Sequence, residues 1–380
     1  MSFVNRTKWM RKMRRIQIYT DQKRRFKNII KTVKEGEKKL DGISNIIPII
    51  DQEVNISEVP SNLKDSIYVP EKIRNSIENI SCIYSEMFCI HHNLSITLHW
   101  INCGTRGVSK KPKGISTLRK MLRNAYVLTE DLLERKDGSL TFYICPTKEK
   151  KNTNDIKING FPIKSTSINN AISIPSMGIA LIYRREECFK VITHEFLHCM
   201  GLTENYISSL TVDNNIVDTL IETLNYDKEQ LIHVTETKND GQFRPNEALV
   251  EYYANLAANI TRANRCGNKY PYKELKKRII NEIRWGIFCL AKISNIAVGC
   301  NVHITQETHF LSYYGLRSIL MFSVERYNDV GRVPLEEIVT IEKLRRFINS
   351  LCKTLVKIQG QQVFNDIQML QSLKMSINES

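Results

Sequence analysis

The sequence has no long apolar run, no apolar leader and no internal repeat. The first two absences indicate where in the cell the protein is found. The longest weakly polar stretch, residues 285–300, is shorter than the roughly 20 residues of a membrane span and contains Lys292, so we expect no transmembrane segment. The N-terminus lacks the apolar core and the cleavage site of a signal peptide. We therefore expect an intracellular, cytoplasmic protein.

Paired cysteines are also missing. The ten cysteines stand singly, without a CxxC pair or a regular spacing. Scattered thiols fit a reducing compartment better than a disulfide framework, and they argue against a zinc site built from cysteine. A chain of 380 residues with 42% hydrophobic residues is instead typical of a globular protein that has room for more than one subdomain.

Positive charge is concentrated at the N-terminus. The chain has a net charge of +15, and residues 1–39 alone hold fourteen Lys and Arg against three acidic residues, which is a local charge of +11. Such a segment can bind nucleic acid or another polyanion, although a solvated helical tail has the same composition. Because residues 45–70 lack a helical period, we predict a basic arm and linker over residues 1–60.

The remaining chain predicts an α+β fold, with a small mixed sheet followed by a mainly helical C-terminal half. We expect an α/β subdomain at 61–205 and a helical subdomain at 206–380. β-branched and aromatic residues predict strands at 95–101, 139–145 and 179–183. Apolar residues at steps of three and four predict helices. These helices are expected at 115–134, 185–200, 246–260, 272–293 and 341–374.

The helix expected at 185–200 carries a metal-binding motif, HExxH, at residues 194–198. Residues four apart share a helix face, so His194 and His198 can bind one Zn²⁺ through nitrogens at about 2.0–2.1 Å. Glu195 then lies beside the water that the metal activates, where it can act as general base. The alternative is a core helix with two histidines satisfied by other partners.

This motif and a later segment, NEALVEYY at 246–253, resemble the gluzincin family of zinc metallopeptidases. The resemblance implies a zincin-like fold, a zinc cofactor and a polypeptide substrate, with Glu247 as the third zinc ligand. Asn170 and Ala171 resemble the start of the edge strand with which gluzincins pair substrate backbone. The region around the motif and Tyr313-Tyr314 is also similar to uncharacterised metallopeptidases of large DNA viruses.

Two other carboxylates compete for the position of third ligand. Glu251 lies one turn after Glu247 and shares its helix face. Glu204, together with Gly201, completes HExxHxxGxxE, which resembles the metzincin motif but has Glu where that family has His or Asp. We expect Glu247, because Pro245 helps to begin the helix and the Asn-Glu pair of the gluzincin resemblance then falls on Asn246 and Glu247.

Hydrolysis of a peptide bond also needs a donor for the oxyanion that forms when water attacks. Candidates for this catalytic role are Tyr313, Tyr314 and His309. The sequence therefore predicts a zinc metallopeptidase that hydrolyses peptide bonds, with Glu195 as its base. The alternative is a non-catalytic zincin-like protein that associates with nucleic acid through its basic arm.

Overall fold

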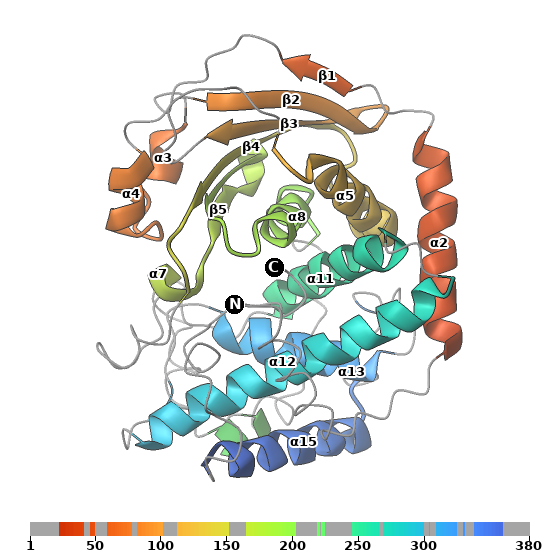
Figure 1. The fold of residues 1–380 in the computed structure, drawn as a ribbon, viewed down its shortest axis with the longest axis vertical. Coiled ribbons are helices and arrows are strands. Elements are labelled where there is room, and N and C mark those ends of the chain that lie inside the picture. Colours follow the sequence, from red (N-terminus) through yellow and green to blue (C-terminus); the bar gives the residue numbers. More distant parts are fainter. Residues whose placement is uncertain are drawn as a thin grey trace.

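The structure is a computed structural model of the full chain (Figure 1). It describes residues 23–41, 46–49, 59–77, 82–101, 112–151, 165–202, 219–220, 222–224, 245–265, 269–299, 304, 309–324, 330 and 338–359. The described parts combine one mixed sheet with a larger helical portion, which confirms the predicted mixture of α and β structure.

The sheet has six strands in the order β1-β2-β3-β4-β6-β5. Its central strands β3, β4 and β6 are parallel, whereas β1, β2 and β5 pair in antiparallel fashion with their neighbours. The strands at 95–101, 139–145 and 179–183 are confirmed as β3, β4 and β6. The strand bounds are β1 Ile46–Ile49, β2 Cys82–His91, β3 Leu94–Ile101, β4 Gly138–Thr147, β5 Ala171–Ile174 and β6 Ile179–Arg184.

Strands β1 and β2 have no counterpart among the predicted elements. The sequence of β2 includes Ser85 and Glu86, which interrupt an apolar alternation, yet both side chains are buried. The Glu86 carboxylate lies 3.4 Å from the Arg119 guanidinium of α5 (Ile115–Thr129), and it accepts a hydrogen bond from the Tyr84 hydroxyl. A buried acid whose ionic partner, Arg119, lies on another element thus hides the strand from a local reading of the sequence.

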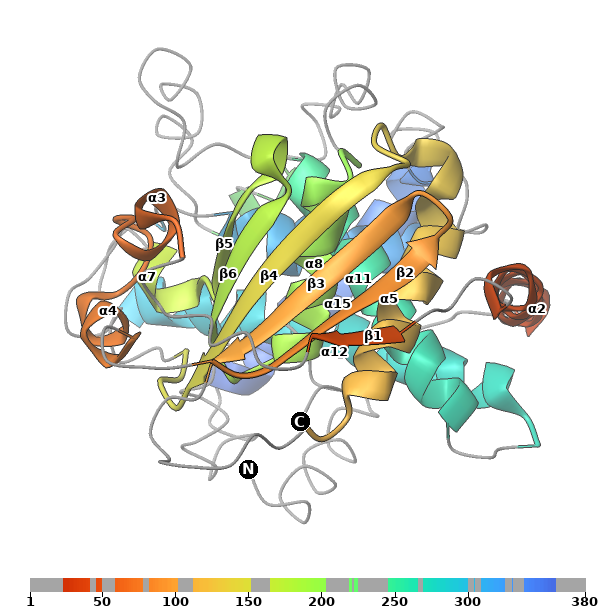
Figure 2. The ribbon, with the colours of Figure 1, turned by 90° about the horizontal axis from the view of Figure 1, so that it is seen from above.

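Helices pack in layers beneath one face of the sheet (Figures 1 and 2). Helices α5 and α8 (Cys188–Cys199) lie directly against the sheet, and α11 (Pro245–Arg265) follows them. The other helices of these layers are α12 Pro271–Gly299, α13 Arg317–Ser323 and α15 Ile341–Gln359. Predicted helices are confirmed in α5, α8, α11, α12 and α15; residues 360–374 of the last lie outside the described residues. No described helix is long and apolar enough to cross a bilayer.

The opposite face carries two short helices, α3 (Ser61–Lys64) and α4 (Glu71–Ile77), and a separate small core. That core joins Leu63 and Ile73 to Leu181 and Tyr183 of β6. Another short helix, α7 (Ser165–Ile168), precedes β5. Both faces of β6 are therefore packed, because its Ala180 and Ile182 belong to the main core, and this fixes the strand that leads into α8.

The predicted basic arm does not remain apart from the fold. Residues 23–41 form helix α2, whose Phe26, Ile29 and Val33 are at most 1% exposed and belong to the main hydrophobic core. This core continues through α5, α8, α11 and α12 to Leu351 of α15. Residues 1–22 of the expected arm lie outside the described residues, and the boundary near residue 205 stays a prediction.

Candidate metal centre

Helix α8 presents the HExxH residues between the sheet edge and α11. Its Ile192, Phe196 and Leu197 are fully buried in the main core, which fixes the rotation of the helix about its axis. Gly201, just after the last turn of α8, adopts a left-handed φ of 70°, and its N–H donates to the carbonyl of His198 at 2.9 Å. The helix therefore ends one turn after the motif begins, with both histidines on the same face.

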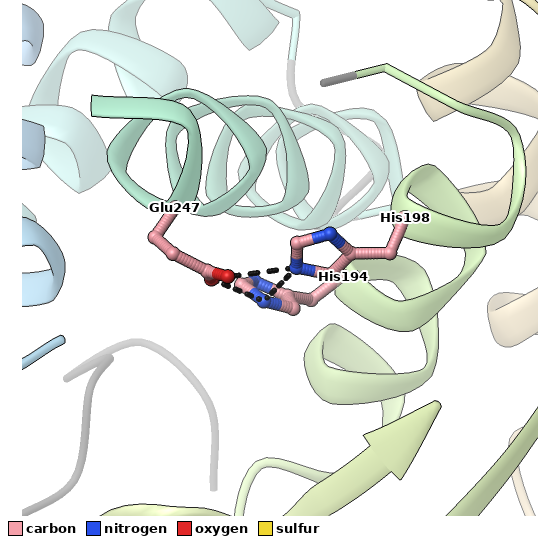
Figure 3. Close-up of side chains that lie close together, drawn as sticks. All are labelled: His194, His198 and Glu247. Atoms are coloured by element: carbon pink, nitrogen blue, oxygen red, sulfur yellow. Dashed lines mark hydrogen bonds and ion pairs between the residues drawn. The ribbon is translucent and has the colours of Figure 1, made fainter. Parts of the chain in front are cut away.

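Three side chains converge in front of this face (Figure 3). The Nε2 atoms of His194 and His198 lie 3.0 Å apart. One carboxylate oxygen of Glu247, in the first turn of α11, lies 3.5 Å from His194 Nε2 and 3.3 Å from His198 Nε2. Within the described parts of the chain, this is the one group of three His, Cys, Asp or Glu side chains that could hold a metal ion.

The spacing of these three atoms fits zinc. Ligands of a tetrahedral Zn²⁺ at about 2.0–2.1 Å lie about 3.3 Å from one another. The observed separations of 3.0, 3.3 and 3.5 Å bracket that value. Two imidazole nitrogens and one carboxylate oxygen are also a donor set found in catalytic zinc sites, where the fourth position stays open.

Glu251 lies behind this ligand group and not within it. Its carboxylate lies 3.1 Å from Nδ1 of His194, while Nε2 of the same ring faces Glu247. Helix α11 therefore brackets the His194 ring with two carboxylates one turn apart. A carboxylate on the second ring nitrogen fixes the tautomer and the orientation of a ligating histidine.

Glu251 is itself held in a fully buried cluster of charges. Its Oε1 accepts hydrogen bonds from the Lys190 ammonium at 2.6 Å and from the Asn255 amide at 2.8 Å. The Arg317 guanidinium lies 3.4 Å from the same oxygen. The Lys190 ammonium also lies 3.8 Å from the carboxylate of Glu187, whose φ of 60° at the start of α8 is left-handed. These contacts leave Glu251 little freedom to move.

The electrostatics of the site favour a bound cation. Burial lowers the pKa of His194, but hydrogen bonds to Glu247 and Glu251 outweigh it and raise that pKa to about 9. Burial raises the pKa of Glu247, yet the charges and hydrogen bonds of His198 and His194 hold it well below its ordinary range. The site thus attracts positive charge strongly, and a divalent cation can supply it in place of protons.

Glu195 faces the edge strand. Its carboxylate accepts a hydrogen bond of 2.6 Å from the Ser173 hydroxyl on β5, and its side chain is 8% exposed. Ser173 is a residue that the sequence reasoning missed. The alternation of a strand places Ser173 and Ala171 on one face of β5 and Ile172 and Ile174 on the other, where they pack on the smaller core. That pattern is too short to be read without the structure.

Of the three candidate oxyanion donors, Tyr313 lies at the ligands. Its hydroxyl donates to Glu247 at 3.4 Å, and its ring centroid lies 6.0 Å from that of His194. The residue belongs to a π-helical turn, Leu311–Leu316, of a kind frequent at functional sites. Burial, followed by the charges of Glu247 and Glu195, raises the pKa of Tyr313 well above its ordinary value, so its proton is retained.

His309 stands behind Tyr313, with the two ring centroids 6.1 Å apart, and its charge lowers the pKa of Glu247. Tyr314 departs from the expectation. It is fully buried, its ring lies 4.7 Å from that of Phe310, and burial raises its pKa well above the ordinary value. Adjacent helical residues point in different directions, so Tyr314 enters the core when Tyr313 faces the ligands.

Comparisons with models of protein families, with curated proteins and with solved structures find no match to this chain. The chemistry must therefore be derived from the residues that the fold brings together.

Of the remaining expected residues, the structure describes Asn170 and Ala171 but not Glu204. Asn170 does not face the ligands. Its side-chain amide donates to the main-chain carbonyl of Glu186 at 2.8 Å, and its main-chain carbonyl accepts from the N–H groups of Tyr183 and Arg184. Ala171 begins β5 and pairs with Ile182 of β6.

Proposed function

We propose that this chain is a zinc metallopeptidase of the zincin type, which hydrolyses peptide bonds in a polypeptide substrate. One observation carries the proposal: His194, His198 and Glu247 meet at zinc-like spacing, with Glu195 beside them and facing a strand at the sheet edge. The gluzincin pattern of the sequence leads to the same three ligands. In this proposal His194 and His198 give nitrogens, Glu247 gives a carboxylate oxygen, and Glu251 orients His194.

His194, His198 and Glu247 would hold a zinc ion, and the bound ion would supply the Lewis acidity needed to polarise a carbonyl group and to activate water near neutral pH. Glu195 takes the proton of the attacking water and passes it to the leaving amine nitrogen. The Ser173 hydroxyl, 2.6 Å from Glu195 Oε2, holds the carboxylate toward β5 while the second oxygen stays available for that proton. Ser173 is thus a positioning residue in this scheme.

Tyr313 is placed to donate a hydrogen bond where negative charge develops on the substrate oxygen. Its hydroxyl already lies at the ligand group, 3.4 Å from Glu247, and its raised pKa keeps it protonated at neutral pH. A preorganised donor of this kind stabilises the transition state more than the ground state. His309 packs against the Tyr313 ring and supports its position.

Strand β5 supplies a site for an extended substrate. It ends the strand order of the sheet, so one of its edges carries no strand among the described residues. An extended peptide can pair with such an edge through main-chain hydrogen bonds. Because Ser173 of the same strand contacts Glu195, a peptide paired with β5 lies within reach of the base.

The proposal is tested with the zinc-loaded full-length chain and an unfolded substrate, carboxymethylated casein, by measuring new α-amino groups. We expect cleavage that a chelator abolishes and that added zinc, but not magnesium, restores, because nitrogen ligands favour zinc over magnesium. If the protein holds zinc but cleaves neither casein nor a broad peptide library, the proposal fails. The non-catalytic zincin-like alternative would then replace it.

A further inference from the structure

Helix α2 turns an almost purely basic face to solvent. Its apolar residues are buried in the main core, and its exposed residues are polar or charged. Among the side chains described for α2, Glu35 is the exposed acid, and its carboxylate pairs with Lys31 at 3.7 Å. Glu37 is only 15% exposed and lies 3.8 Å from Lys120 of α5. The exposed basic residues of α2 are Lys23, Arg24, Lys27, Lys31, Lys34, Lys38 and Lys39.

The start of α12 extends this face. Helix α12 packs against α2, and the Lys27 ammonium lies 5.4 Å from the ring centroid of Tyr272. Both views place α2 at the periphery of the molecule with the first turns of α12 beside it (Figures 1 and 2). Exposed lysines continue there as Lys269, Lys273 and Lys277. We call the seven α2 residues and these three lysines the α2–α12 basic surface.

An exposed aromatic ring lies within this surface. Tyr270 is 46% exposed, and the ammonium groups of Lys273 and Lys269 lie 4.4 and 5.9 Å from its ring centroid. The nearby acid Glu274 is 19% exposed and is engaged by Arg278 at 2.9 Å and Lys277 at 3.7 Å. A large exposed ring flanked by cations, with its local acid already paired, combines the two features that bind single-stranded nucleic acid.

We propose that the α2–α12 basic surface binds single-stranded nucleic acid, with the lysines on phosphates and Tyr270 stacked on a base. The exposed stripe from Lys23 to Lys39 extends about 24 Å along the helix at 1.5 Å per residue, enough to follow several consecutive phosphates. The inference does not depend on the proposed peptidase activity. It also differs from the arm hypothesis, because it assigns binding to the folded part of residues 1–39 and adds residues near 270.

The same observations speak against a membrane as the partner. An amphipathic helix that lies in a bilayer inserts its apolar face between the lipids. In α2 that face, including Phe26, Ile29 and Val33, is already buried in the protein core. The face left to solvent carries only polar and charged side chains, with no apolar anchor for a bilayer.

The test is fluorescence anisotropy of a labelled oligothymidylate of about 20 nucleotides, longer than the stripe, with the full chain at several salt concentrations. We expect the triple variant Lys27→Gln, Lys34→Gln and Lys38→Gln to bind roughly a hundredfold more weakly at about 0.1 M salt. Its salt slope should fall by about two, because each lost phosphate contact removes about 0.7. A matched control changes three exposed lysines elsewhere, Lys136, Lys148 and Lys353, to Gln and should keep the wild-type slope.

Tyr270 separates stacking from charge. Tyr270→Ala should weaken binding by about tenfold with an unchanged salt slope, whereas Tyr270→Phe keeps the ring and should bind as the wild type does. If the triple variant of α2 and the triple control variant bind the oligonucleotide equally, the proposal is overturned. This holds even if deletion of residues 1–22 abolishes binding, because those residues and not the α2–α12 basic surface would then bind the nucleic acid. The proposal is also overturned if the protein sediments with phosphatidylserine vesicles but does not bind the oligonucleotide. A membrane would then be the partner.

Discussion

Replacing Glu195 with glutamine should leave the zinc content unchanged and lower kcat by about 10²–10⁴-fold, the usual contribution of a general acid–base group. The change removes a proton acceptor but keeps the size of the side chain and the hydrogen bond from Ser173, since the glutamine oxygen can still accept it. Glu195 is not among the three residues that could hold the metal, so its replacement should lower the rate of hydrolysis without changing the amount of bound zinc. The measurement pairs metal analysis with steady-state cleavage of one peptide.

The matched control is Glu149→Gln, which changes an exposed carboxylate just after β4 and should match the wild type in both measurements. Equal kcat for Glu195→Gln and the wild type would remove Glu195 from the mechanism. Loss of zinc from Glu195→Gln would instead assign the residue to the metal, and the role of base would need another group.

Lys190→Met should lower the free energy of unfolding by about 3–5 kcal/mol, the cost of breaking a buried ion pair by removing one partner. The Lys190 ammonium is fully buried, 2.6 Å from Glu251 and 3.8 Å from Glu187. Burial lowers its pKa, but the charges of Glu251 and Glu187 outweigh this and hold the pKa above its ordinary value, so the residue carries a charge at neutral pH. Methionine matches its volume but leaves both acids without that charge.

Denaturant unfolding in the presence of a chelator measures this effect without the contribution of bound metal. Lys353→Met, on the exposed side of α15, is the matched control and should change stability by less than about 0.5 kcal/mol. If Lys190→Met is as stable as this control, the buried cluster does not support Glu251, and the orientation of His194 must have another origin.

The parts of the site that the sequence predicted are those with a local rule. His194, Glu195 and His198 follow from helical spacing, and Glu247 follows from a pattern on a helix that a proline begins. The partners Ser173, Lys190 and Arg317 have no such rule, because each joins the site from another element through a tertiary contact. Their residue types are common, so only the folded chain distinguishes them.

The fold shows the same limit. Strands β3, β4 and β6 are buried, apolar and easily predicted, whereas β2 is disguised by its buried acid Glu86, whose partner Arg119 lies on α5. The positive charge of residues 1–39 favours a basic arm, and most of helix α2 lies within that stretch. The apolar residues of α2 nevertheless recur at helical spacing, and a packed helix with a basic outer face satisfies both patterns.

Metal analysis of the purified chain and three of its variants tests the central claim most directly. We expect about one zinc per wild-type chain and loss of that zinc in Glu247→Ala. Glu251→Ala should retain zinc with an affinity reduced about 10–100-fold, because Glu251 acts on the metal only through His194. Glu204→Ala should bind zinc as the wild type does. A wild-type chain without zinc affinity, or a Glu204→Ala variant that alone loses the metal while Glu247→Ala keeps it, would contradict the proposed site.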